Sequence, residues 1–91
     1  MTDEAVEAVN LSDLVAEEIR AMMARKRISG RQLAQKLGVS PSWVSYRLTG
    51  VQPIDLNDLQ RIAHALDVIV LNLLPRQALQ PRTSSTEATT R

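Results

Sequence analysis

The stretch from Ser29 to Gly50 reads SGRQLAQKLGVSPSWVSYRLTG, and it contains the starts of two short helices. Ser29 is a candidate N-cap, and Gln32 stands three residues later, at the spacing of a capping box. Ser40 is the second candidate N-cap. Pro41 follows it at the first helical position, where the missing N–H of proline costs nothing.

Glycines mark the ends of the same two helices. Gly38 and Gly50 suit the left-handed conformation that commonly follows the last turn of a helix. We therefore expect helices over about residues 30–37 and 41–49. Because only about three residues join them, the two helices must cross steeply, which is the helix-turn-helix geometry. Ala34 is expected where they approach most closely.

Helical signals continue on both sides of this stretch. A first helix is expected from Leu11, with Asn10 or Ser12 as its cap and with apolar residues at helical spacing: Leu11, Val15, Ile19, Met22 and Met23. Asp55, with Asp58 three residues later, predicts a helix over 56–66. The apolar run 68–74 is expected to form a fifth.

The chain as a whole is predicted to be all-α: a compact bundle of about five helices over residues 11–75. We expect a flexible acidic segment over 1–10 and a flexible tail over 76–91, because neither segment carries enough apolar surface to offset the entropy of ordering.

Composition excludes several classes of protein. With 91 residues the chain is long enough for one domain. It has no Cys and one His, and it lacks a nucleophile–base–acid set or a phosphate-binding glycine loop, so we expect no enzyme activity, no metal and no cofactor. No apolar run approaches the ~20 residues of a membrane span, and the first residues are acidic where a secretory signal is basic. We expect a cytoplasmic protein, of a bacterium or of a phage-infected host.

The small net charge of +1 hides an uneven distribution of charged residues. Residues 1–18 carry six acidic and no basic residues, residues 19–54 carry seven basic and no acidic ones, and residues 55–91 carry four of each. A block of 36 residues with seven cations is typical of a protein that binds a polyanion. A solvated basic face is the alternative.

Helical spacing divides the 41–49 helix into faces. Val44 and Leu48 are expected to point into the core. Four uncharged residues are expected to face outward, with Ser45 on one flank and the others roughly opposite the core: Ser42, Tyr46 and Thr49. Trp43 and Arg47 share the remaining flank, where a cation–π contact is expected. Trp43 can either pack on the rim of the bundle or lie against sugar-phosphate. The candidate phosphate contacts are Arg27, Arg31, Lys36, Trp43, Arg47 and Thr49.

This stretch resembles the helix-turn-helix of the lambda-repressor-like, Cro-family regulators. The residues that carry the resemblance are Leu33-Ala34, Gly38-Val39-Ser40, Val44-Ser45 and Gly50, with Leu59-x-x-Ile62-Ala63-x-Ala65-Leu66 further on. The resemblance covers about residues 11–75 and implies a bundle of five helices. It also implies that bases of double-stranded DNA are read by Pro41, Ser42, Ser45 and Tyr46. Many members of the family place an apolar residue where Arg47 stands and a polar one where Leu48 stands.

From these observations we expect a sequence-specific DNA-binding transcriptional regulator, a repressor of phage or bacterial type that acts by promoter occlusion. The alternative is an antitoxin that neutralises a toxin protein and autoregulates through the same domain. The tail after Pro75 is then a candidate segment for a protein partner. The run Val68–Leu74 either completes the core or leaves a surface for a homodimer.

Overall fold

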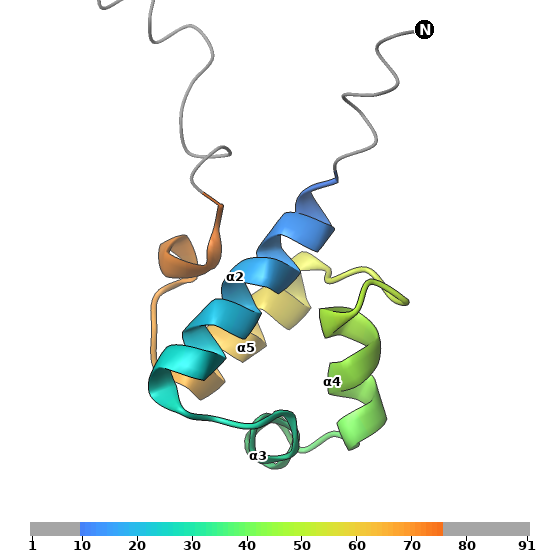
Figure 1. The fold of residues 1–91 in the computed structure, drawn as a ribbon, viewed down its shortest axis with the longest axis vertical. Helices are drawn as coiled ribbons and strands as arrows, with labels where there is room; N and C mark the ends of the chain where they lie inside the picture. Colours follow the sequence, from blue (N-terminus) through green and yellow to red (C-terminus); the bar gives the residue numbers. More distant parts are fainter. Residues whose placement is uncertain (1–9, 76–91) are drawn as a thin grey trace, which may run out of the picture.

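The computed structural model describes residues 10–75, and it is helical (Figure 1). Four α-helices are followed by one short 3-10 helix: α2 (Leu11–Lys26), α3 (Gly30–Leu37), α4 (Pro41–Leu48), α5 (Leu56–Leu66) and η1 (Val70–Leu73). The predicted all-α bundle is confirmed. The fifth helix is shorter than the run 68–74 suggested, and it is 3-10 in kind. The two segments predicted to be flexible lie outside the described residues, apart from Asn10.

The predicted helix starts are all present. Asn10, and not Ser12, caps α2: its side chain accepts a hydrogen bond from the N–H of Asp13 at 2.9 Å. Ser29 and Asp55 each form a complete capping box, the first with Gln32 and the second with Asp58. These caps satisfy N–H groups that have no partner inside a helix. The starts of α2, α3 and α5 are therefore fixed by short-range sequence signals.

The link between α3 and α4 is set by one left-handed residue. Gly38 has φ 75°, and its N–H returns to the carbonyl groups of Ala34 and Gln35. Ser40 then caps α4 by accepting from the N–H of Trp43 at 3.2 Å. The chain therefore turns within three residues, as predicted. α4 ends at Leu48 and not at 49, and Thr49 is its C-cap.

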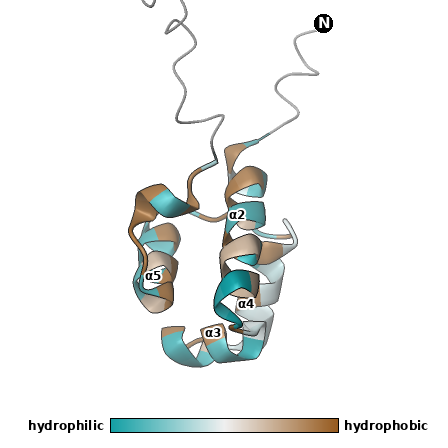
Figure 2. Ribbon diagram, turned by 60° about the vertical axis from the view of Figure 1, so that its left-hand side comes forward, coloured by the Kyte–Doolittle hydropathy of each residue, from teal (hydrophilic) through white to brown (hydrophobic). Residues whose placement is uncertain are grey.

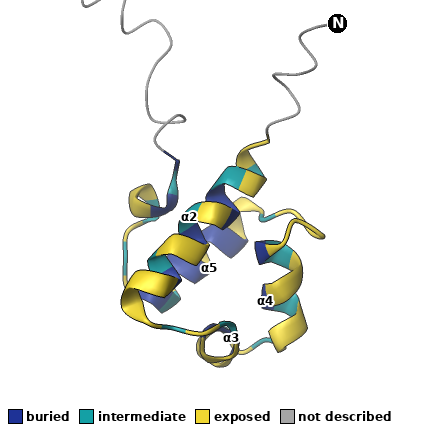
Figure 3. Ribbon diagram, in the orientation of Figure 1, coloured by how far each residue is buried: buried dark blue, intermediate teal, exposed yellow. Residues whose placement is uncertain are grey.

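One apolar core joins all five helices. α3 packs against α4 and α5, α2 packs against α4, and η1 lies against both α2 and α5. Figure 2 shows hydrophobic and hydrophilic residues alternating along α2 and α5, and Figure 3 shows the buried residues of α2, α4 and α5 on the sides that face this shared interior. The largest fully buried side chains are Ile19, Leu33, Ile62, Leu66, Leu73 and Pro75. The core thus packs α3 against α5, α4 against α2, and α3 and α4 against each other.

The run 68–74 completes the core with part of its length and leaves the rest exposed; a homodimer through the exposed part stays a prediction. Leu73 is fully buried and completes the core, whereas Ile69 and Leu71 are 62% and 58% exposed.

Within residues 10–75, no helix combines the length and apolar character that crossing a membrane requires.

Candidate nucleic-acid interface

The outer face of α4 is the centre of the candidate interface. Val44 and Leu48 point into the core, and Leu48 is only 9% exposed. The four base-reading candidates are all exposed: Ser42 and Tyr46 lie opposite the buried pair, Ser45 lies on a flank, and Pro41 is the first residue of the helix. Tyr46 is 48% exposed. All four base-reading candidates are therefore accessible to a partner at the surface of α4. The prediction that Leu48, and not Arg47, is the inward residue is confirmed.

Small residues in α3 allow α4 to approach closely. Ala34 is almost completely buried in the core that α3 shares with α4. Gly30, one turn earlier, also faces α4, because a Cβ built there would lie 3.9 Å from Cγ1 of Val44. The expected small residue at the crossing is present at Ala34, and Gly30 is a second one that sequence reasoning missed.

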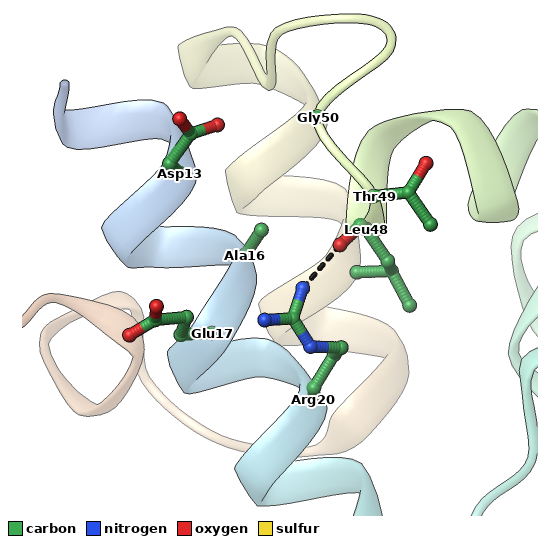
Figure 4. A pocket seen from close by; sticks show the side chains of 7 residues that line it. All are labelled: Asp13, Ala16, Glu17, Arg20, Leu48, Thr49 and Gly50. Atoms are coloured by element: carbon green, nitrogen blue, oxygen red, sulfur yellow. Dashed lines mark hydrogen bonds between the residues drawn. The ribbon is translucent and has the colours of Figure 1, made fainter. Parts of the chain in front are cut away.

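The C-terminal end of α4 is fastened to α2. Figure 4 shows Arg20 of α2 reaching across a hollow to the backbone carbonyl of Leu48, to which its Nη1 donates a hydrogen bond. The same hollow is lined by Asp13, Glu17 and Thr49. The loop that follows α4 is tied to α2 as well, since the N–H of Ile54 donates to Oγ of Ser12 at 2.8 Å. Ser12, one of the two candidate caps, therefore anchors this loop.

The flank of α4 that carries Trp43 and Arg47 faces α5. Nε of Arg47 donates to Oδ2 of Asp58 at 3.1 Å, and its guanidinium lies 3.9 Å from the centroid of the Trp43 ring. The expected cation–π contact is therefore present. Trp43 is half-buried and packs against the core, which is the rim position considered for it. Whether Arg47 or Trp43 also contacts phosphate stays a prediction.

The other phosphate candidates are exposed but do not share one surface. Arg31 and Lys36 both lie on α3, and five residues of helix separate their directions by about 140°. Lys36 lines a shallow hollow with α5 residues, among them Arg61 and His64. Arg27 is the left-handed C-cap of α2, with φ 57°. Thr49 uses its hydroxyl to donate to the carbonyl of Ser45 at 2.7 Å.

Sequence reasoning missed three side chains that shape this interface. Arg20 and Arg61 each donate to the last carbonyl of a helix, Arg20 to that of α4 and Arg61 to that of α3. Asp58 was expected only as part of a cap. Each of the three has a partner 11 or more residues away, and no local spacing in the sequence indicates these long-range contacts.

The described residues contain no group of three or more His, Asp or Glu side chains placed to hold a metal ion.

Residues 14–73 match the family described as helix-turn-helix domain. Among solved structures, the clp gene regulator ClgR from Corynebacterium glutamicum is 26% identical over 71% of this chain and 84% of that chain, with a TM-score of 0.68. A hypothetical transcription factor from Neisseria, NHTF, shares the fold at 24% identity over 87% of this chain and 85% of that chain, with a TM-score of 0.66.

The structure of FeII HppE is similar to this chain in one part only. It is 28% identical over 72% of this chain but over only 35% of its own length, with a TM-score of 0.64. No curated protein matches this chain.

Proposed function

The chain belongs to the helix-turn-helix domain family, and from that premise we propose that it is a sequence-specific transcriptional regulator that binds double-stranded DNA. α4 enters the major groove, and its outer face reads the bases. The observation that carries this proposal is the surface of α4 itself, where Ser42, Ser45 and Tyr46 lie exposed on one uncharged face. Side chains of this kind can hydrogen-bond to base edges without attracting DNA in general.

Charge supports the same proposal. Exposed basic residues lie on both sides of the turn that joins α2 to α3. Arg25, Lys26 and Arg27 are at the end of α2, and Arg31 is in the first turn of α3. The N-termini of α3 and α4 also carry N–H groups that suit phosphate oxygens. These groups would orient the domain on the backbone of the duplex while α4 supplies sequence discrimination.

We propose that the bound protein acts as a repressor by covering a promoter, a mechanism that needs neither a cofactor nor a chemical step. ClgR, the structural neighbour at 26% identity, is named as a regulator of the clp gene, which is consistent with a regulatory role. The exposed pair Ile69 and Leu71 suits contact with a second copy, and a dimer would bind a two-fold site.

The test begins with selection of bound sequences from a random duplex library. Tyr46→Ala and Ser42→Ala are then titrated against the selected duplex and a scrambled one. Each is expected to weaken the selected site by about 1–3 kcal/mol and to leave scrambled DNA nearly unchanged. His64→Ala, an exposed change on α5, is the matched control. Equal losses on both duplexes would refute base reading by α4, and a stably co-purifying protein in place of DNA binding would favour the antitoxin alternative.

A further inference from the structure

A little-exposed carboxylate lies between α5 and α4. Asp58, in the first turn of α5, is 7% exposed. It accepts hydrogen bonds from the N–H of Asp55 at 3.4 Å and from Nε of Arg47 at 3.1 Å. A carboxylate this buried must keep its partners, because removing one leaves a poorly solvated charge. One side chain therefore both caps α5 and holds a side chain of α4.

Arg47 is held at three points. Besides its bond to Asp58, its Nη1 donates to the carbonyl of Trp43 at 3.4 Å, and its guanidinium stacks on the Trp43 ring. Its side chain is 19% exposed. A contact from this guanidinium to DNA phosphate would have to compete with all three of these interactions.

Arg61 extends the same arrangement to α3. It lies one turn after Asp58 on α5, and its guanidinium is 5.6 Å from the centroid of the same Trp43 ring. Its Nη2 donates to the carbonyl of Leu37, the last residue of α3, at 3.1 Å. α5 thus contacts α4 through Asp58 and α3 through Arg61, and both Arg47 and Arg61 lie close to the Trp43 ring.

We propose that Arg47, Asp58, Arg61 and Trp43 form a clamp through which α5 fixes the position of α4 relative to α3, and that Arg47 and Asp58 thereby determine DNA sequence specificity without touching DNA. This inference rests on the proposed DNA-binding function. Arg47 is then a positioning residue, in place of the phosphate contact that its charge alone suggested.

The reason lies in the different tolerances of the two kinds of DNA contact. Hydrogen bonds from Ser42 or Tyr46 to base edges require donor–acceptor distances of about 2.7–3.2 Å, so a small shift of α4 breaks them. Attraction to phosphate is long-ranged and independent of sequence. Loosening the clamp should therefore reduce affinity for the selected site and leave affinity for scrambled DNA almost unchanged.

The key variant is Arg47→Lys in the full chain. Lysine keeps the positive charge but loses Nε–H and the planar group that stacks on Trp43. If Arg47 belongs to the clamp, this variant weakens the selected duplex roughly tenfold, as does Asp58→Asn. Binding to scrambled DNA stays within about twofold, and the slope of log K against log salt is unchanged. Arg31→Gln is the matched control, and it should weaken both duplexes and flatten the slope by about one.

The opposite pattern would overturn the clamp. If Arg47 contacts phosphate, Arg47→Lys binds like the unchanged chain, and Asp58→Asn strengthens binding to both duplexes with a steeper slope because it frees Arg47. A chain that binds no duplex selectively refutes the proposed function. If the unchanged chain selects a site, and Arg47→Lys and Asp58→Asn bind that site as tightly as the unchanged chain does, the clamp alone is refuted.

A measurement without DNA checks the clamp directly. Trp43 is the only tryptophan in the chain, so its fluorescence reports the stacked guanidinium. Its emission is expected to change in Arg47→Lys and Asp58→Asn but not in Arg31→Gln, while circular dichroism shows that each variant keeps its helices. Unchanged emission in both clamp variants would refute the stacked arrangement.

Discussion

Replacing Leu48 with alanine tests the orientation of α4 without altering its outer face. Leu48 is the last residue of α4 and is 9% exposed, within the core that also contains Val15, Ile19 and Val44. The change removes three buried carbon atoms. At about 0.8 kcal/mol each, transfer alone accounts for roughly 2.4 kcal/mol. Incomplete closure of the resulting cavity brings the expected loss to about 2–5 kcal/mol.

That loss is large for a domain of this size. A folded unit of residues 10–75 is expected to have a free energy of unfolding of roughly 3–10 kcal/mol. Leu48→Ala should therefore move the urea midpoint far toward zero, and Trp43 fluorescence can follow the transition because Trp43 packs against the same core. The slope of the free energy against urea should stay near that of the unchanged chain if unfolding remains two-state.

The matched control is Ser45→Ala, on the exposed side of the same helix. It is expected to change stability by no more than about 0.5 kcal/mol. If Leu48→Ala and Ser45→Ala destabilised the chain equally, Leu48 could not be the inward residue. α4 would then be rotated, and the assignment of its base-reading face would fail with it.

Three further changes test the packing of α3 on α4, the cap of α5 and the exposed side of η1. Ala34→Leu should overpack the crossing of α3 and α4 and cost about 1–3 kcal/mol in urea unfolding, whereas Gln35→Leu, on the exposed side of α3, should not. Asp55→Ala removes the cap of α5 and should lower stability by about 0.5–2 kcal/mol, and no loss would show that the capping box does not contribute. Leu71→Glu should weaken self-association in sedimentation without changing the helical signal; a chain that is monomeric at all concentrations would refute a dimer through η1.

The fold could be predicted from the sequence because its signals act over a few residues. A capping box needs only Ser29 and Gln32, and a left-handed turn needs only Gly38. Such local agreements place each helix start within a residue or two, and the apolar spacing then decides which side of the helix is buried. The same reasoning correctly placed Leu48 inside and Tyr46 outside, so the outer face of α4 was predicted as a set.

The limits appear where a charged residue finds a distant partner. Arg47 was counted with the cations of residues 19–54, as if each were available to DNA. In the folded chain, Asp58 lies 3.1 Å from its Nε, although the two residues belong to different helices. A charge count treats all seven cations of that block as equal. Arg47 is paired with Asp58 and is less exposed than the other six, which makes it the least available to DNA.

Arg31 on α3 and Arg47 on α4 carry the same guanidinium group, so the difference between them comes from their surroundings in the fold. Arg31 is exposed and can neutralise a phosphate wherever one lies within reach. Arg47 binds Asp58 and Trp43, so its charge is already paired inside the protein. An exposed cation sets how strongly a domain binds any duplex. A cation held inside the clamp sets how precisely α4 is positioned to read one particular sequence. Only the folded structure shows which of the two roles a given cation has.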